Sequence, residues 1–406
     1  MATHKVLIVG GGFGGVKAAL ELSKHDDFSI TFLSNNLDFS YYPTFYHTAT
    51  GGMREQSYIP IKQLLAEQIA AKKVRFVLGT AKKLDRAAKT LHASDSRKYK
   101  YDTLIMGLGN VTNYFGIKGL AEYSYSIKSK DEIVRFKRHL HDQLLDDRKP
   151  ELNYVIVGGG PTGIELAGAL PEYIRTIRKN HNLRRRKLHI DLVETSPHLL
   201  PRCSKATSRA VERRLRQLGV RLYLKSAVQG QDANGLIING KPIQSHTVVW
   251  TAGVSNNPFF KDNGFTLDPR GKVVVDEHLR AEPHIYVLGD NASTQYSGMA
   301  QTALLNGELV ATNLMREHEG KPLKADKPKL PVTVIPVGAN WAAVEWGKVH
   351  FAGKSGWALR SAADWIGYLD ITSLIPATEQ WFTEFGRYEE CPTCSVALMP
   401  KPAYQT

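Results

Sequence analysis

The sequence has few cysteines, no long apolar run and fewer acidic than basic residues. Three cysteines among 406 residues are too few for a disulfide framework and are typical of a reducing compartment. No apolar run approaches the roughly 18 residues that a membrane-spanning helix needs. The first expected strand begins at Lys5, which leaves no room for a secretory signal. The chain is therefore expected to fold in the cytosol.

The shortage of acidic residues leaves a formal net charge of +14, from 53 Lys and Arg against 39 Asp and Glu. Such an excess calls for an anionic partner: nucleotide phosphates, an acidic membrane surface or nucleic acid. Many of the basic residues lie in the stretch 175–187, for which a solvated helix end and a contact with anionic lipid are both open explanations. Nucleic acid is disfavoured, because this stretch lacks interleaved aromatics and RNA-binding or zinc-finger signatures.

Two glycine-rich turns are the most informative part of the sequence. The pattern G-x-G-x-x-G follows a short apolar run at residues 10–15 and again at residues 158–163, each time before a predicted helix. In such turns glycines let a pyrophosphate approach the backbone, and the helix N-terminus offers free N–H groups. Two turns in one chain predict two bound dinucleotides.

The residues at the ends of the next strands indicate which dinucleotides these are. Ser34 and Asn35 occupy the first ribose position, where their side chains bond hydroxyls more weakly than a carboxylate does, as suits FAD held by other contacts. Glu194 closes the strand 188–193 and would bond a ribose 2′-OH but repel a 2′-phosphate, so NADH is predicted over NADPH. The alternative is an ordinary glutamate at a strand end.

Other segments repeat the strand-then-glycine theme or are rich in aromatics. Residues 103–109 and 247–254 each read as a strand that ends in glycine, and Asp290 follows another such strand. The Asp290 carboxylate can lie near cofactor hydroxyls or a flavin edge, although an aspartate there is more often a helix N-cap. The aromatic loop 38–52 suits a planar cofactor or a hydrophobic substrate, or ordinary packing.

The C-terminal part has a different composition, since five of the six tryptophans follow residue 340. One predicted helix has an apolar face, and Arg360 and Asp364 are paired at i, i+4 on the opposite face. The apolar face comprises Ala358, Ala362, Trp365, Ile366 and Leu369. A helix of this kind can lie in the headgroup layer of a membrane without spanning it. A dimer interface or a lid over the flavin domain explains the same pattern.

Cys391 and Cys394 have the C-x-x-C spacing of a redox or zinc pair, but the chain contains no second pair. A structural or idle pair is the favoured interpretation, and no metal site is predicted.

Taken in order, these motifs resemble the flavoproteins with two dinucleotide-binding domains, and among them the type II NADH:quinone oxidoreductases. The most specific signs are residues 158–168, 250–254 and 299–303, and the loop that ends at Gly51. The resemblance implies an α/β fold of two Rossmann-like domains and a C-terminal amphipathic helical region. The FAD domain would comprise residues 1–112 and 256–330, the inserted NADH domain residues 113–255, and the membrane-association or dimerisation region residues 331–406.

The resemblance also implies an activity, in which hydride passes from NADH to FAD and two electrons then pass to a membrane quinone without proton pumping. The protein would be a peripheral enzyme on the cytoplasmic face of an anionic membrane, and a homodimer. Two alternatives stay open: a soluble NADH-dependent FAD reductase with another acceptor, and a slow NAD(H)–flavin redox-sensing binding protein.

By the same resemblance, Glu165 and Gln301 are the expected catalytic residues. Expected FAD-binding residues are Gly10, Gly12, Phe13, Gly14, Gly15, Ser34, Asn35, Thr50, Gly109, Asp290, Ala300 and Gln301. Expected NADH-binding residues are Gly158, Gly160, Pro161, Thr162, Gly163, Glu165, Glu194 and Gly253. Gln301 and Leu305 would line the quinone pocket. Family members usually carry two glutamines where this chain has Leu305 and Asn306, so the pocket is expected to be more apolar and the quinone is left open.

Overall fold

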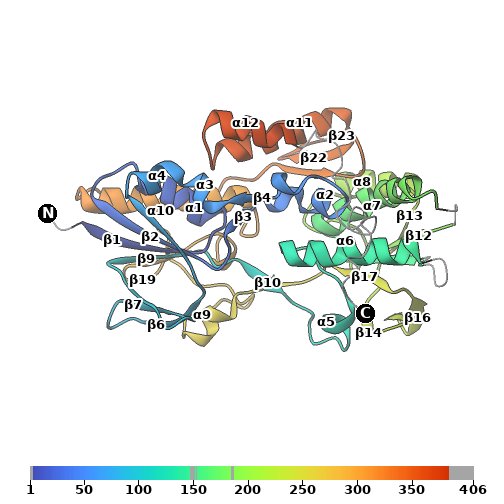
Figure 1. The fold of residues 1–406 in the computed structure, drawn as a ribbon, viewed down its shortest axis with the longest axis horizontal. Coiled ribbons are helices and arrows are strands. Elements are labelled where there is room, and N and C mark those ends of the chain that lie inside the picture. The colour runs from blue at the N-terminus through green and yellow to red at the C-terminus, as the bar shows by residue number, and fades with distance from the viewer. Residues whose placement is uncertain (1–2, 147–150, 152, 184–186, 384–406) are drawn as a thin grey trace, which may run out of the picture.

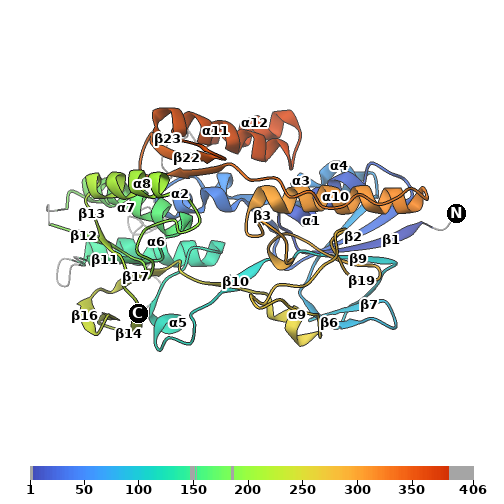
Figure 2. The same cartoon turned by 180° about the vertical axis from the view of Figure 1, so that it is seen from behind.

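Two parallel β-sheets with helices packed on them form the two halves of the molecule (Figure 1). The computed structural model describes residues 3–146, 151, 153–183 and 187–383. Figure 2 shows from behind that the C-terminal helices lie over the junction between the halves. The predicted α/β architecture is confirmed.

The first sheet has the strand order β19-β20-β9-β1-β2-β5, with β19 antiparallel to the rest. Its strands are β1 (His4–Val9), β2 (Phe28–Ser34), β5 (Val74–Leu78), β9 (Thr103–Met106), β19 (Arg280–Glu282) and β20 (Ile285–Val287). Helices α1 (Phe13–Leu22) and α10 (Ala300–His318) cover one face, and the small sheet of β6 (Ala81–Asp85), β7 (Thr90–Ala93) and β8 (Lys98–Lys100) covers the other. Because β20 pairs with β9, two distant parts of the sequence build one sheet.

The second sheet has the order β13-β12-β11-β17 and is fully parallel. Its strands are β11 (Asn153–Val157), β12 (His189–Val193), β13 (Val220–Tyr223) and β17 (Thr247–Trp250). Around it lie α6 (Lys130–Leu145), α7 (Pro161–Asn180), α8 (Lys205–Gln217), β14 (Val228–Asp232), β15 (Gly235–Ile238) and β16 (Lys241–Gln244). Ser129 and Glu132 form a capping box that starts α6.

Two crossing segments join the halves and pair as a ribbon. In this ribbon β10 (Asn110–Thr112) runs antiparallel to β18 (Val254–Asn256). The predicted limits at 112/113 and 255/256 fall within it, and we propose the ribbon as the domain boundary.

Short elements fill the connections between the larger ones. They are β3 (Asp38–Ser40), η1 (Tyr42–Thr44), α2 (Phe45–Ala49), η2 (Arg54–Gln56), β4 (Tyr58–Pro60), α3 (Ile61–Leu64), α4 (Ala66–Ala70), α5 (Leu120–Tyr123), α9 (Pro258–Asp262) and η3 (Gly289–Asn291). Residues 59 and 60 pair with β3 as part of β4, and the helical stretch that follows breaks into α3 and α4 at Leu65, whose ψ of 20° is not helical.

The C-terminal part is a small antiparallel sheet followed by two helices: β21 (Thr333–Pro336), β22 (Ala342–Trp346), β23 (Val349–Gly353), α11 (Lys354–Leu369) and α12 (Leu374–Phe382). The sheet packs on α7 and α8, and α11 packs on the sheet. In the described part of the chain, no helix is both long enough and apolar enough to cross a membrane. Cys391 and Cys394 lie outside the described residues.

Helix α11 does not bury the face that its pattern of apolar residues would suggest. The predicted i, i+4 pair is present, but Arg360 and Asp364 are 7% and 1% exposed, whereas Ile366 on the apolar face is 56% exposed. The charged face points inward because it finds hydrogen-bond partners in the first half of the molecule. Ala358, Ala362 and Ile366 of the apolar face are therefore left on the outside, while Trp365 and Leu369 are half-buried.

The close packing of α1 on α10 predicts that a larger side chain between the two helices will destabilise the first half of the molecule. A Cβ atom at Gly307 would lie 2.4 Å from the carbonyl oxygen of Gly14, so a side chain there must push the helices apart. Gly307→Leu is expected to lower the free energy of unfolding by about 1–3 kcal/mol or more. The control Glu308→Leu puts the same side chain on the exposed next position of α10. Equal unfolding midpoints in denaturant for the two variants would contradict this packing.

Candidate active site

The first glycine turn is shaped by a close approach between backbones. Gly10 has φ +117°, and a Cβ atom there would lie 2.0 Å from the carbonyl oxygen of Gly107 at the end of β9. A Cβ atom at Gly15 would lie 2.1 Å from the carbonyl oxygen of Gly10. At Gly12, by contrast, the Cβ position has no described heavy atom within 4 Å beyond its chain neighbours and its own helix. The turn is therefore packed tightly against the backbone at Gly107, whereas the space beside Gly12 is open.

The second turn repeats this geometry. Gly158 has φ +120°, a Cβ atom at Gly163 would lie 2.0 Å from its carbonyl oxygen, and the Cβ position of Gly160 is open. Gly12 and Gly160 are the N-caps of α1 and α7, and neither helix is capped by a described side chain. Free backbone N–H groups and the positive end of the helix dipole face an open space at each turn. Both turns fit the pyrophosphate of a dinucleotide.

The two predicted ribose positions lie at equivalent places beside these turns. A Cβ atom at Gly11 would lie 2.6 Å from the Ser34 Oγ, and Glu194 accepts a 2.6 Å hydrogen bond from the N–H of Gly159. Burial tends to raise the pKa of Glu194, but hydrogen bonds from the backbone of Ser196 and Gly159 lower it overall. Glu194 is thus a carboxylate at neutral pH. Asn35 is exposed.

Two asparagines that the sequence analysis did not predict as site residues form hydrogen bonds at the carboxyl ends of strands in the first sheet. The Asn291 side chain accepts from the Gly109 N–H and donates to its carbonyl oxygen, each at 2.8 Å. Asn110 donates a 2.7 Å hydrogen bond to Asp290. Burial raises the pKa of Asp290 overall, although the positive charges of Lys272 and Lys128 act to lower it. Asp290 and Gly109 therefore meet at one sheet edge, as expected of parallel strands.

The side chains of some predicted site residues contact other parts of the protein instead of facing the glycine turns. The Phe13 ring packs on Phe39, with centroids 4.9 Å apart, so only its backbone faces the turn. The Thr50 hydroxyl donates to the carbonyl oxygen of Tyr46 at 2.9 Å. Gly253 is buried, and a Cβ atom there would lie 2.4 Å from the carbonyl oxygen of Asn113. Pro161 and Thr162 are exposed in the first turn of α7.

Helix α10 begins with Ala300 and Gln301 and is not capped by the Met299 side chain. Gln301 is exposed, and Leu305 is half-buried one turn later. Asn306 is 1% exposed and accepts a 3.1 Å hydrogen bond from the N–H of Gly289. Asn306 therefore holds the turn that presents Asp290, which gives this departure from the usual glutamine a structural role.

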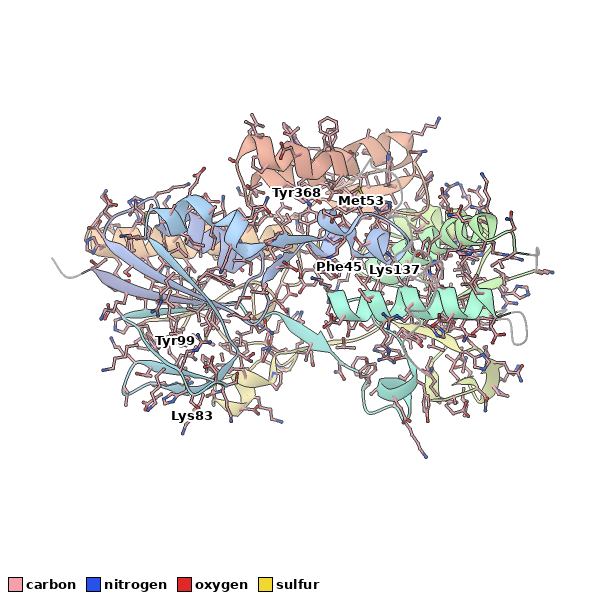
Figure 3. The ribbon with its side chains drawn as sticks, in the orientation of Figure 1. Phe45, Met53, Lys83, Tyr99, Lys137 and Tyr368 are labelled. Atoms are coloured by element: carbon pink, nitrogen blue, oxygen red, sulfur yellow. The ribbon has the colours of Figure 1, made fainter. Side chains whose placement is uncertain are left out.

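A buried charge cluster lies where α7, α11 and the loop before α2 meet. Arg360 donates to Asp364 at 2.8 Å and to the carbonyl oxygen of Pro43 at 2.8 Å, and Tyr41 donates to Asp364 at 3.0 Å. Tyr368 stacks on Tyr41, with centroids 4.3 Å apart, and lies between α11 and the first half (Figure 3).

Glu165 of α7 is half-buried and interacts electrostatically with Arg360 and Asp364. Burial raises its pKa from an ordinary value of 4.5 to about 8, while Arg360 lowers it and Asp364 raises it. The raised pKa favours the protonated form of the Glu165 carboxyl. Sequence reasoning found Glu165 but not its partners, which come from a helix about 200 residues further along the chain.

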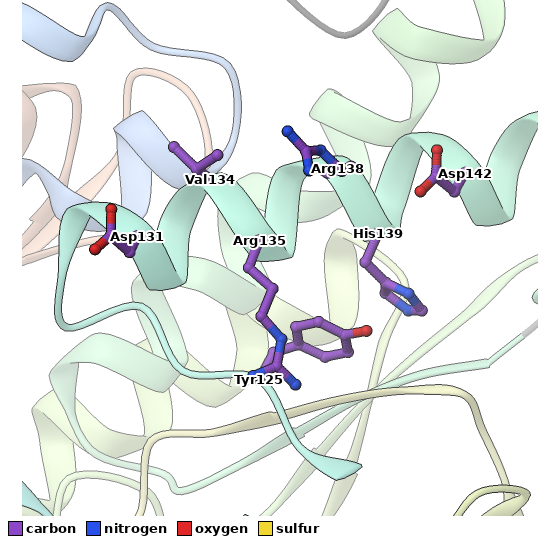
Figure 4. Close-up of a pocket in the computed structure, with 7 residues that line it drawn as sticks. All are labelled: Tyr125, Asp131, Val134, Arg135, Arg138, His139 and Asp142. Atoms are coloured by element: carbon purple, nitrogen blue, oxygen red, sulfur yellow. The ribbon is translucent and has the colours of Figure 1, made fainter. Parts of the chain in front are cut away.

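A separate hollow on α6 contains none of the predicted site residues (Figure 4). Its lining includes a stack of Tyr125 on His139, with centroids 4.4 Å apart, and the Arg135 guanidinium 5.0 Å from the Tyr125 ring centroid. Burial lowers the pKa of His139 to about 4, so this imidazole is neutral. These groups are partners of one another, and we assign the hollow no role.

Two parallel sheets that each carry a glycine turn define a protein class with two dinucleotide-binding units. The family model of the pyridine nucleotide-disulphide oxidoreductases matches residues 4–307, and the chain belongs to this family. Residues 4–307 contain a single cysteine, Cys203, so this chain lacks the cysteine pair of a dithiol–disulfide centre there.

Curated relatives and solved structures narrow the comparison. The chain is 28% identical to the type II NADH:quinone oxidoreductase Ndh of Mycobacterium tuberculosis, over 88% of this chain and 82% of the relative. It is 28% identical to the type II NADH:quinone oxidoreductase of Staphylococcus epidermidis, over 89% of this chain and 94% of the relative. The structure of NDH2 from Plasmodium falciparum in complex with NADH matches with a TM-score of 0.84, at 16% identity, over 95% and 98% of the two chains. The resemblance noted from the sequence is confirmed.

The raised pKa of Glu165 predicts how stability changes with pH. The folded protein binds this proton more tightly than the unfolded chain, so the stability contributed by Glu165 falls as pH rises from about 4.5 to about 8. Glu165→Gln should therefore match the parent protein at pH 4.5 and become the more stable of the two at pH 8–9. Thermal unfolding of both proteins across this range tests the point. A midpoint difference that does not change with pH would show that Glu165 titrates normally.

Proposed function

We propose that this chain is an FAD-dependent NADH:quinone oxidoreductase. The observation that carries the proposal is the pair of equivalent glycine turns, one beside Ser34 and the other beside the Glu194 carboxylate. FAD occupies the first turn and NADH the second. The overall reaction converts NADH, a proton and a quinone into NAD⁺ and the quinol.

FAD, when bound, supplies a hydride acceptor that then gives two electrons to the quinone. Residues 10–15 and the N–H groups of α1 hold the pyrophosphate of FAD. Asp290 and Gly109 hold the cofactor hydroxyls or the flavin edge beside it. The first turn of α10, at Ala300 and Gln301, supplies free N–H groups to the flavin ring. The protein thereby fixes the ring against which the nicotinamide must lie.

The second half holds NADH and selects it over NADPH. The first turn of α7 binds the pyrophosphate, and Glu194 bonds the ribose hydroxyls. Glu165 lies on α7 five residues after its N-cap, and its carboxyl, whose pKa is raised, gives a proton during acceptor reduction. Gln301 and the apolar Leu305 line the quinone end of the site.

Steady-state oxidation of NADH by a panel of short-chain quinones tests the proposal. Flavin-loaded protein should oxidise NADH with at least one quinone at roughly 1–1000 turnovers per second. NADH oxidation that is indifferent to quinone but fast with another acceptor would favour a soluble FAD reductase. Turnover below about one per minute with every acceptor would favour a redox-sensing binding protein.

Glu194 gives a sharper prediction about the nucleotide. Glu194→Ala should lower kcat/KM for NADH by about 10- to 100-fold, because a charge-assisted hydrogen bond to the ribose is lost. The preference for NADH over NADPH should narrow as well, while flavin content stays unchanged. Glu277→Ala, which removes a carboxylate with 73% of its side chain exposed, is the control. An unchanged ratio of NADH to NADPH activity would remove Glu194 from the site.

The outward face of the C-terminal helices supports a peripheral position on a membrane. Large apolar side chains are exposed there, namely Ile366, Leu374, Ile375 and Phe382, and Ile375 is 72% exposed; Trp346 at the end of β22 is exposed as well. Exposed Lys348 and Lys354 flank them, and the exposed arginines of α8 lie on a helix that packs against β22 and β23. We propose that this face binds the cytoplasmic side of an anionic membrane. A homodimer through the same face is the alternative. Residues 184–186 of the basic stretch lie outside the described residues.

Vesicle sedimentation separates the membrane from the dimer. Ile375→Glu should lower binding to vesicles of phosphatidylcholine with phosphatidylglycerol several-fold, because it places a charge at the apolar–water boundary. Ile237→Glu makes the same change on β15, whose neighbours β14 and β16 lie on the other side of the molecule from α11 and α12 (Figure 1), and should leave binding unchanged. Loss of a dimer in Ile375→Glu, without any change in vesicle binding, would instead assign this face to a second copy.

A further inference from the structure

The segment between β10 and α5 (Figure 1) exposes a large aromatic side chain. This residue, Phe115, is 60% exposed. Its φ of +52° lies in the left-handed region, which a bulky residue enters only at an energetic cost. Single exposed apolar residues are normal on a folded protein. An exposed aromatic ring at a strained backbone position is unusual, and such positions are concentrated at ligand-binding sites.

Asn113 holds this segment in its strained conformation. Its side-chain oxygen accepts a 2.8 Å hydrogen bond from the Phe115 N–H, and its carbonyl oxygen accepts a 2.9 Å hydrogen bond from the Trp250 indole. The Phe115 ring packs edge-on against the Trp250 ring, with centroids 6.3 Å apart. The segment therefore presents the Phe115 ring in a defined position on the second half of the molecule.

The Phe115 ring lies at the carboxyl end of β17. A Cβ atom at Gly253 would lie 2.6 Å from the Cε2 atom of this ring, so the ring can approach the backbone there only because residue 253 is glycine. The preceding residue, Ala252, is the one whose backbone nitrogen would lie 2.8 Å from a Cβ atom at Gly158. Phe115 is thus placed one residue beyond the contact that shapes the second glycine turn.

The strand order of the second sheet, β13-β12-β11-β17, determines which part of a dinucleotide lies beside Phe115. The glycine turn follows β11, Glu194 follows β12, and Gly253 follows β17. Glu194 and Phe115 therefore flank the turn on opposite sides. A dinucleotide with its pyrophosphate at the turn and its adenosine ribose at Glu194 extends its other nucleoside toward the end of β17. In NADH that nucleoside is the nicotinamide riboside.

The chemistry of an exposed phenylalanine suits this end of the nucleotide. The nicotinamide ring is planar and uncharged in NADH, and planar rings gain free energy by packing against an aromatic side chain. In NAD⁺ the same ring carries a positive charge, which the face of an aromatic ring also attracts.

We propose that Phe115 is a binding residue for the nicotinamide riboside of NADH. The second site then contacts the nucleotide at both ends, through Glu194 at the adenosine ribose and through Phe115 at the nicotinamide. The ring thereby restricts the orientations in which the nicotinamide reaches the flavin. This inference rests on the proposed function, because it takes NADH as the ligand of the second turn.

Isothermal titration of the flavin-loaded protein with NAD⁺ and, separately, with ADP tests the proposal. ADP carries the adenosine and two phosphates but lacks the nicotinamide riboside. Phe115→Asn removes the ring and introduces a residue that tolerates a positive φ. This variant should bind NAD⁺ about 3- to 10-fold more weakly than the parent protein and should bind ADP equally well. Glu194→Ala, by contrast, should weaken the binding of both ligands.

Three further variants keep the test decisive. Phe115→Gly removes the ring together with the backbone strain and should show the same selective loss of NAD⁺ affinity, whether or not Phe115→Asn folds. Phe115→Tyr retains an aromatic ring and should restore the affinity for NAD⁺. Val134→Ala truncates an apolar residue of α6 that is 49% exposed in the same half, and it should change neither affinity.

The two ligands separate failure of the inference from failure of the proposed function. If the flavin-loaded parent protein binds neither NAD⁺ nor ADP, the second turn is not a nucleotide site, and both are overturned. If the parent protein binds both ligands but the variants without the ring keep their NAD⁺ affinity, or lose NAD⁺ and ADP affinity alike, Phe115 does not contact the nicotinamide and the proposed function stands.

Discussion

The structure depends on a close contact between each glycine turn and the end of the neighbouring parallel strand. At the first turn this contact joins Gly10 to Gly107, and at the second it joins Gly158 to the backbone of Ala252. Neither contact leaves room for a Cβ atom, and each directs the following helix so that its N-terminus faces open space. Since both turns obey one constraint, the two halves present equivalent sites, and the ribbon of β10 and β18 connects them.

A second constraint ties the C-terminal part to these halves. Its sheet packs on α7 and α8, whereas α11 reaches across to the loop that contains Tyr41 and Pro43. Polar bonds direct this docking, so the helix turns Arg360 and Asp364 inward and exposes Ile366. The same docking therefore buries the ion pair of Arg360 and Asp364 against the first half of the molecule and leaves Ile366 exposed.

Much of this could be predicted from the sequence, for identifiable reasons. A glycine turn is a local pattern, so residues 10–15 and 158–163 indicated both sites, and Glu194 could be placed by its position after a strand. The i, i+4 pairing of Arg360 with Asp364 is local too. Which face of α11 is buried is not local, since it depends on Tyr41 and Pro43, more than 300 residues away. The roles of Asn291 and Asn306 were missed for the same reason: each side chain bonds a backbone that periodicity does not bring near.

Binding stoichiometry tests most directly whether one chain holds two different dinucleotides at equivalent turns. The purified protein should show a flavin spectrum with one FAD per chain, and isothermal titration of the flavin-loaded protein with NAD⁺ should give one further site that excess FAD does not compete for. A colourless protein that takes up no flavin on reconstitution, or a single site for which FAD and NAD⁺ compete, would contradict the account.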